Sequence, residues 1–127
     1  MRIFLVRHAH AAPGEPDELR PLTPEGEAAA EELAQALAAA QPTAVICSPL
    51  LRARQTADRI AEAAGLETEI DERLAPGATS LSLREAAEER GGTVVAVAHQ
   101  PDCSEIVLKV TGRRVSFAPA HVEELRL

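Results

Sequence analysis

Two imidazoles and one guanidinium lie close together near the start of the chain, where residues 4–13 read FLVRHAHAAP. Arg7, His8 and His10 follow an apolar run directly, which places them at the end of a predicted buried strand. A neutral imidazole nitrogen is a nucleophile or a metal ligand, and a guanidinium offers paired donors that suit phosphate oxygens. The segment therefore points to phosphoryl chemistry or to metal binding.

A second cationic motif, CSPLLRARQTAD, occupies residues 47–58. The pair Ser48–Pro49 is typical of a helix start, with serine as the cap and proline as the first helical residue. Arg52 would then lie one turn into the helix and lean back over the strand end, with Gln55 and Thr56 on the same face. Together with Arg7 it predicts a phosphate clamp, because guanidiniums stay charged at every relevant pH and bind phosphate oxygens in pairs.

A third motif places His99 at the end of the apolar run TVVAVAH. If this run and the first strand are parallel neighbours, His99 and His8 meet at the same edge of the sheet, where ligands collect in open α/β sheets. His8 is then a candidate nucleophile that attacks phosphorus with a neutral ring nitrogen, and His99 a candidate donor to the phosphoryl oxygens. Such a reaction needs in-line placement and neutralised oxygens more than a metal.

The elements expected along the chain alternate between strands and helices. Strands are predicted at residues 2–7, 43–47 and 93–99, with a weaker extended piece at 67–70 and a closing strand at 121–127. Helices are predicted from Thr23–Pro24 to about residue 40, from Ser48–Pro49 to about residue 64, from a capping box of Ser82 and Glu85 to just before Gly91, and from Pro101 to Gly112. This order predicts an α/β fold, a three-layer sandwich whose mainly parallel central sheet is flanked by helices.

Composition restricts the class of protein. A chain of 127 residues is expected to form one domain, residues 1–127, around one core. The net charge of −7 and the 2% of aromatic residues argue against nucleic-acid binding and against an anionic membrane surface. Cys47 and Cys103 are too few for a disulfide framework, and no signal peptide or transmembrane segment is recognised. We therefore expect a cytoplasmic protein with reduced cysteines.

Four motifs in this order resemble the histidine phosphatase superfamily, and in particular its small SixA-like phosphohistidine phosphatase branch. They are VRHAHA near the start, RPLTPEGE at 20–27, SPLLRARQTA at 48–57 and VVAVAHQP at 94–101. The resemblance implies that His8 becomes transiently phosphorylated, that Arg7 and Arg52 bind the phosphoryl group, and that His99 is the second histidine of the pocket. Arg20 matches a further arginine of the small branch. The resemblance also implies a three-layer α/β sandwich without metal or organic cofactor.

Two departures from the superfamily pattern matter. Ala9 stands where the superfamily usually has glycine after the nucleophile. The larger relatives also carry, after the second motif, a loop whose carboxylic acid protonates an alcohol leaving group, and no matching acid appears in the short LAPGATS stretch. Glu72 precedes that stretch and is expected to be a solvent-exposed turn residue. An alkoxide leaves poorly without a proton donor, whereas the nitrogen of a phosphoramidate can leave already protonated, so phosphohistidine on a protein is the favoured substrate.

Three alternatives remain at this stage. The first is a small-molecule phosphomonoesterase of the same superfamily, and the second is a non-catalytic phosphate-binding interaction module. The third is a metal hydrolase that uses His8, His10 and His99, since His8 and His10 would face the same side of a strand. The guanidiniums beside the site oppose a cation, and we expect His10 at the pocket rim or in an exposed loop and His121 at the surface.

Overall fold

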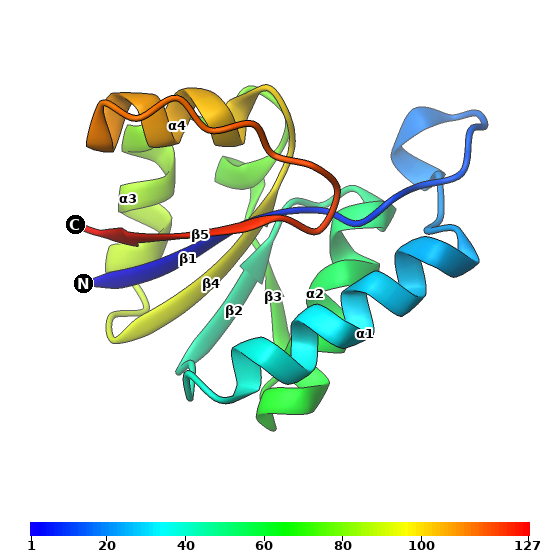
Figure 1. Cartoon of the computed structure of the whole chain (residues 1–127), viewed down its shortest axis with the longest axis horizontal. Helices are drawn as coiled ribbons and strands as arrows, with labels where there is room; N and C mark the ends of the chain where they lie inside the picture. The colour runs from blue at the N-terminus through cyan, green and yellow to red at the C-terminus, as the bar shows by residue number, and fades with distance from the viewer.

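The computed structural model describes residues 1–127 and builds a five-stranded sheet between two layers of helices (Figure 1). The strand order is β3-β2-β4-β1-β5, with parallel pairing throughout except that β5 runs antiparallel to β1. The strands are β1 Arg2–Arg7, β2 Ala44–Cys47, β3 Thr68–Ile70, β4 Thr93–Ala98 and β5 Val122–Arg126. The helices are α1 Pro24–Ala38, α2 Leu51–Ala64, α3 Ser80–Glu88 and α4 Asp102–Thr111, with short 3-10 turns η1 Asp17–Leu19 and η2 Glu72–Leu74. The predicted α/β sandwich with a mainly parallel sheet is confirmed.

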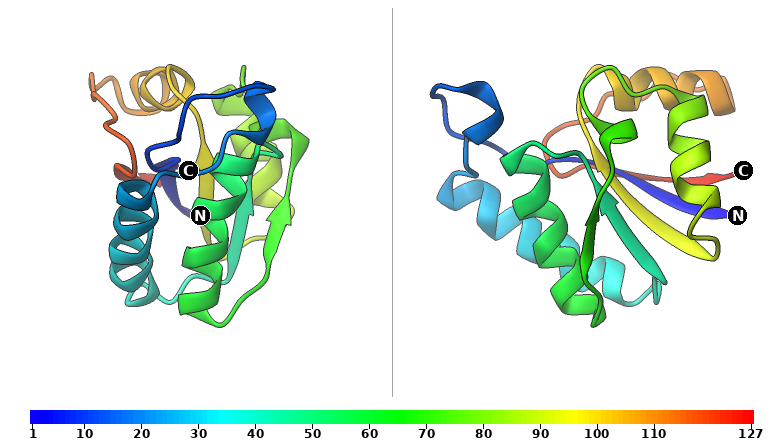
Figure 2. Two further views of the ribbon diagram at one scale, coloured as in Figure 1. Left: turned by 90° about the vertical axis from the view of Figure 1, so that its right-hand side faces the viewer. Right: turned by 180° about the vertical axis from the view of Figure 1, so that it is seen from behind.

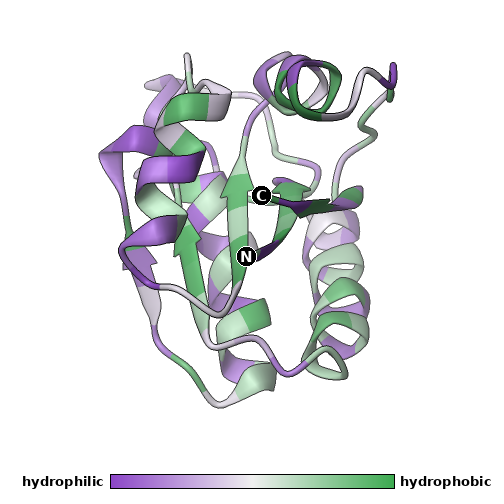
Figure 3. Cartoon of the chain, turned by 90° about the vertical axis from the view of Figure 1, so that its left-hand side faces the viewer, coloured by the Kyte–Doolittle hydropathy of each residue, from purple (hydrophilic) through white to green (hydrophobic).

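The strands β1, β2 and β4 each supply buried residues to both layers of the core. In β1, Ile3 and Leu5 pack into one hydrophobic cluster, whereas Phe4 and Val6 pack into the other. Figure 2 shows α1 and α2 on one face of the sheet and α3 and α4 on the opposite face. Because both faces are covered, β1, β2 and β4 are largely apolar runs, and Figure 3 colours the central strands mainly as hydrophobic while the helices are mixed.

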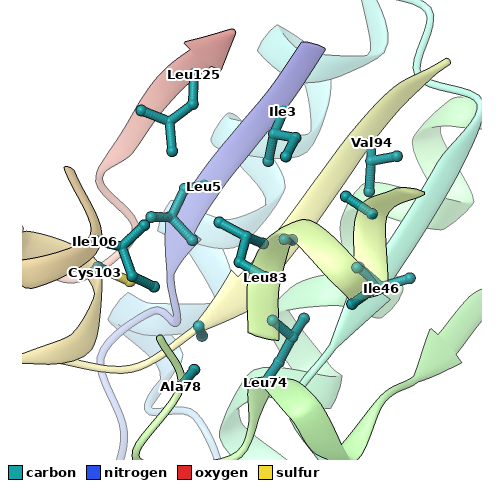
Figure 4. Close-up of a cluster of buried hydrophobic side chains, with 14 of the residues drawn as sticks. Ile3, Leu5, Ile46, Leu74, Ala78, Leu83, Val94, Cys103, Ile106 and Leu125 are labelled. Atoms are coloured by element: carbon teal, nitrogen blue, oxygen red, sulfur yellow. The ribbon is translucent and has the colours of Figure 1, made fainter. Parts of the chain in front are cut away.

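The cluster beneath α3 and α4 is the larger of the two. Figure 4 shows Leu5 of β1, Leu83 of α3 and Ile106 of α4 converging on it. Cys103 belongs to this cluster and Cys47 to the other, and both thiols are free. Burial raises the pKa of each thiol to about 12, so both remain protonated packing residues.

Two helix starts differ from the prediction. The expected start of α1 is confirmed, because the Thr23 side chain accepts the Gly26 N–H ahead of Pro24. Helix α2 begins at Leu51 and not at Pro49, since the backbone of Leu50 is extended, with φ −70° and ψ 140°. Helix α3 begins at Ser80 after a capping box of Thr79 and Ser82, so the predicted box was placed three residues too late.

The segment between β1 and α1 projects beyond the carboxyl end of β1, away from the two chain termini, which lie side by side (Figures 1 and 2). Its turn η1 contacts α2. We call residues 9–22 the flap. No helix in the structure combines the length and the apolar character needed to cross a membrane.

Candidate active site

Two histidines meet at the carboxyl edge of the sheet because their strands are paired in register. Arg7 of β1 lies opposite Ala98 of β4, so the next residues along these strands are His8 and His99. The His8 N–H donates to the Ala98 carbonyl at 3.1 Å, which continues the ladder past the end of the strand. The two rings lie with their centroids 5.2 Å apart at an interplanar angle of 58°. The juxtaposition that parallel pairing predicted is present.

The His8 ring is held in one tautomer. Its Nδ1 lies 2.7 Å from the Ala9 carbonyl oxygen, which only accepts, so Nδ1 carries the proton and Nε2 has a free lone pair. Burial, together with the nearby charges of Arg52, Arg7 and Arg20, lowers the pKa of His8 to about 4. The ring is therefore neutral near pH 7, the state that a nitrogen nucleophile requires.

His99 is oriented by a buried serine. Its Nε2 lies 2.7 Å from Ser48 Oγ, and that oxygen also accepts the Leu50 N–H at 3.2 Å. No other acceptor contacts the Ser48 hydroxyl, so we infer that its proton is donated to His99 Nε2, which leaves the ring proton on Nδ1. His99 Nδ1 is buried and has no hydrogen-bond partner. Burial, followed by the charges of His8 and Arg52, lowers the pKa of His99 to about 3, so this ring is also neutral.

Arg7 and Arg52 are each held by a hydrogen bond to a backbone carbonyl. Arg7 donates from one terminal nitrogen to the Phe117 carbonyl at 2.9 Å, and its Nε is buried without a partner. Arg52, only 7% exposed, donates to the Asp17 carbonyl at 2.9 Å and to the Asp17 carboxylate at 3.2 Å. The unpaired Arg7 Nε and His99 Nδ1 are buried donors from two elements, and a phosphoryl oxygen is the kind of group that would satisfy both.

Arg20 lies on the flap, at the outer side of the same group. Its Nε donates to the Ala12 carbonyl at 2.8 Å, and one terminal nitrogen donates to the Asp17 carboxylate at 3.0 Å. Its charge contributes to the lowered pKa of His8, so it acts on the nucleophile through space. Arg20 therefore lies close enough to His8 to affect its pKa, but its Nε and one terminal nitrogen are hydrogen-bonded to residues of the flap.

The remaining residues of the second motif anchor the flap to α2. Gln55 accepts the Leu22 N–H at 2.8 Å. Thr56 accepts the Ala9 N–H at 3.0 Å and donates its own hydroxyl to the Arg52 carbonyl at 2.8 Å. The two side chains therefore hold the two ends of the flap. They lie on the same helix face as Arg52, as predicted.

Ala9 is accommodated without crowding the site. Its side chain is fully buried in a small cluster with Leu22 and Ala30. The β-carbon that replaces the usual glycine hydrogen therefore packs against the flap and α1.

The other two histidines are placed outside this group. His10 is exposed and pairs with the Thr23 hydroxyl at 2.9 Å. His121 is partly exposed, lies 2.6 Å from a Glu123 carboxylate oxygen and packs edge-on against Phe117. No group of three or more His, Cys, Asp or Glu side chains is arranged to hold a metal ion.

Residues 73–79, which lack the expected acid, form a short stretch that is held by a hydrogen bond to a buried side chain. Glu72 is exposed in η2, as predicted, and residues 73–79 contain no carboxylic acid. The buried Asp102 at the start of α4 accepts the Gly77 N–H at 2.8 Å and thereby secures this stretch.

The larger hollows of the surface lie away from the two histidines. The most spacious, about 560 Å³, runs along α3 and α4 and is lined by Arg84, Lys109 and Arg126 among others. None of the five hollows in the structure is lined by His8 or His99. His8 is partly exposed and His99 is buried, so the two histidines meet at the sheet edge outside these hollows.

Sequence reasoning missed two residues of this arrangement. Ser48 was predicted as a helix cap at the edge that carries His8 and His99, but not as the partner of His99, and Asp17 was not singled out. The spacing of Asp17 and Arg20, three residues apart in a short turn, was the one local signal for an ion pair on the flap.

Comparison with known proteins agrees with this geometry. The model of the histidine phosphatase superfamily (branch 1) matches residues 3–76. An uncharacterised protein of Picosynechococcus sp. is 34% identical over 140 residues, which cover 99% of this chain and 85% of that protein. The structure of the protein histidine phosphatase SixA complexed with tungstate superposes with a TM-score of 0.87 at 26% identity, covering 100% of this chain and 88% of the other.

A more distant structure shares the fold. The mycobacterial glucosyl-3-phosphoglycerate phosphatase superposes with a TM-score of 0.75 at 19% identity, covering 97% of this chain and 88% of the other. The family match spans more than half of the chain and includes the first histidine and the second motif. The chain therefore belongs to the histidine phosphatase superfamily, in its SixA-like branch, and is a phosphatase.

Proposed function

We propose that the chain hydrolyses phosphohistidine on a protein, through a phosphorylated His8 and without a metal or organic cofactor. The observation that carries this proposal is the fixed tautomer of His8. Its Nδ1 is committed to the Ala9 carbonyl, so the neutral ring presents the Nε2 lone pair, and the neighbouring Arg7 and His99 carry buried donors without a partner at Nε and Nδ1. This is a nucleophile next to donors for the oxygens of a phosphoryl group.

The reaction proceeds in two displacements. The His8 Nε2 lone pair forms a bond to phosphorus while the bond from phosphorus to the substrate nitrogen breaks, and the substrate imidazole departs with its proton. Arg7, Arg52 and Arg20 balance the charge of the phosphoryl oxygens, to which His99 Nδ1–H donates. Water then attacks phosphorus, the bond to Nε2 breaks, inorganic phosphate leaves and His8 returns to its neutral state.

Two features favour phosphohistidine over a phosphate ester. The stretch of residues 73–79 has no carboxylic acid to protonate an alkoxide, whereas a P–N bond releases a nitrogen that is already protonated. In addition, none of the five surface hollows is lined by His8 or His99, whereas small-molecule sites are usually cavities of about 300–1,000 Å³. A phosphoryl group carried on the surface of another protein needs no such enclosure.

The test compares a phosphohistidine protein with phenyl phosphate as substrates for the wild type, His8→Ala and His10→Ala. We expect His8→Ala to lose activity on both substrates. His10→Ala deletes an exposed imidazole two residues away and is expected to keep activity within about twofold, since an exposed hydrogen bond contributes little. Rapid quenching should trap an acid-labile phosphoryl group on the wild type only.

Three outcomes would contradict the proposal. Turnover by folded His8→Ala would remove His8 from the nucleophile's role. A preference for phenyl phosphate over phosphohistidine would point to a small-molecule phosphomonoesterase. Stoichiometric zinc in active protein, with activity lost on chelation and in His10→Ala, would indicate a metal hydrolase.

A further inference from the structure

A carboxylate lies across two of the arginines assigned to phosphate binding. One oxygen of Asp17 accepts from a terminal nitrogen of Arg20 at 3.0 Å, and the other accepts from a terminal nitrogen of Arg52 at 3.2 Å. The Asp17 backbone carbonyl accepts from the second terminal nitrogen of Arg52 at 2.9 Å. Asp17 of the flap thus binds both guanidiniums, although Arg20 is 3 residues and Arg52 is 35 residues away from it in sequence.

The three side chains differ in their exposure to solvent. The Asp17 side chain is 60% exposed, that of Arg20 is 29% exposed and that of Arg52 is 9% exposed. Arg52 Nε makes no hydrogen bond within the protein, so this donor remains free for a phosphoryl oxygen. Asp17 therefore takes up both terminal nitrogens of Arg52 and one of Arg20, and leaves Arg52 Nε without a protein partner.

Asp17 stays ionised in this position. Hydrogen bonds from Arg20 and then from Arg52 hold the pKa of the Asp17 carboxyl below its usual value. A carboxylate stabilised in this way is a poor proton donor near pH 7, so it does not replace the acid that residues 73–79 lack. Its negative charge is a permanent feature of the mouth of the site.

We propose that Asp17 is a specificity-determining residue that occupies the place where a second anionic group of a substrate would bind. This inference rests on the proposed phosphoryl site and adds the class of leaving group that the site accepts. Without Asp17, Arg20 and Arg52 would offer free paired donors to a carboxylate or second phosphate next to the reacting phosphoryl group. With Asp17 in place, such a group meets a fixed negative charge, whereas a neutral or cationic leaving group such as imidazole does not.

The experiment measures binding of two probes that differ by one carboxylate, methylphosphonate and phosphonoacetate, by calorimetry. The variants are Asp17→Asn, the charge-restoring double variant Asp17→Asn with Arg20→Gln, and the control Glu18→Gln. Glu18 is an exposed neighbour whose side chain makes no hydrogen bond or ion pair, so its variant removes the same charge from the flap while leaving the bridge intact. The ratio of the two dissociation constants cancels changes that affect the phosphonate alone.

We expect Asp17→Asn to shift this ratio roughly threefold to tenfold in favour of phosphonoacetate, the size expected for removing one charge about 6–8 Å away at the surface. The shift should shrink as salt is raised. The double variant should return the ratio towards the wild-type value, because it removes a donor that Asp17→Asn exposes.

An unchanged ratio in folded Asp17→Asn, or an equal shift in Glu18→Gln, would overturn the inference. Because the probes are not turned over, the result is independent of the proposed reaction. A protein that shows the expected shift but does not hydrolyse phosphohistidine would refute the proposed substrate and leave the role of Asp17 intact.

Discussion

The buried hydroxyl of Ser48 offers the sharpest test of how the site is organised. Its oxygen is fully buried, accepts the Leu50 N–H and lies 2.7 Å from His99 Nε2. Ser48→Ala removes this oxygen with little change in volume. His99 Nε2 and the Leu50 N–H then lose their partner, and nothing holds the imidazole proton on Nδ1.

The magnitude follows from these two losses. Leaving a buried polar group unpaired costs about 1–3 kcal/mol, so the free energy of unfolding of Ser48→Ala should fall by about that amount. A ring protonated on Nε2 presents a bare Nδ1 lone pair to the phosphoryl oxygens and removes a donor from the transition state. Loss of one such donor lowers kcat by about 10²–10³ in other enzymes, and since the variant retains the productive tautomer part of the time, we expect a fall of about tenfold to a hundredfold.

The assay combines kinetics with spectroscopy. Steady-state hydrolysis of phenyl phosphate gives kcat and KM, and ¹⁵N chemical shifts of His99 report which ring nitrogen carries the proton. Ser116→Ala is the matched control, since Ser116 is exposed and makes no side-chain hydrogen bond. We expect Ser48→Ala to lower kcat more than it changes KM, and the control to change neither.

Two results would refute this reasoning. The first is a wild-type His99 protonated on Nε2, because the serine would then be an acceptor and would not set the tautomer. The second is a kcat for Ser48→Ala within about threefold of wild type while the protein has lost stability by the expected amount. In that case the hydrogen bond contributes to folding alone.

Three further predictions concern pH and packing. The pKa of His8, about 4, predicts that kcat/KM, corrected for substrate ionisation, stays constant down to that range as pH falls; a loss centred near 6.5 would contradict a buried neutral ring. Gly26→Ala would place its Cβ against a backbone carbonyl of the flap, so we expect urea unfolding to show a loss of about 1–3 kcal/mol. Hydrogen bonds from Arg73 and Arg90 hold the pKa of the Asp71 carboxyl well below its usual value. The stability that they provide is therefore present above about pH 4 and is lost as the pH falls below it. Thermal unfolding of Asp71→Asn should show lower stability at neutral pH and a shallower dependence of stability on acid pH.

Much of the architecture is readable from short stretches of the sequence. The apolar run of β1 is continuous because both of its faces are covered, and the Thr23–Pro24 pair starts α1 through a local cap. His8 and His99 each end such a run, so parallel pairing brought them to one edge in the prediction and in the structure. These features depend on residues that are neighbours in sequence or on a rule of sheet geometry.

Other features depend on contacts between distant segments. Ser48 has the sequence signature of a cap, but its hydroxyl is used by His99, 51 residues away, and α2 starts later. Asp17 bridges Arg20 and Arg52 only because the flap folds back onto α2. A local sequence pattern indicates which hydrogen bonds a side chain is able to make. The packing of the sheet and the flap decides which of them forms, because a buried polar group pairs with a partner that tertiary contacts bring within reach.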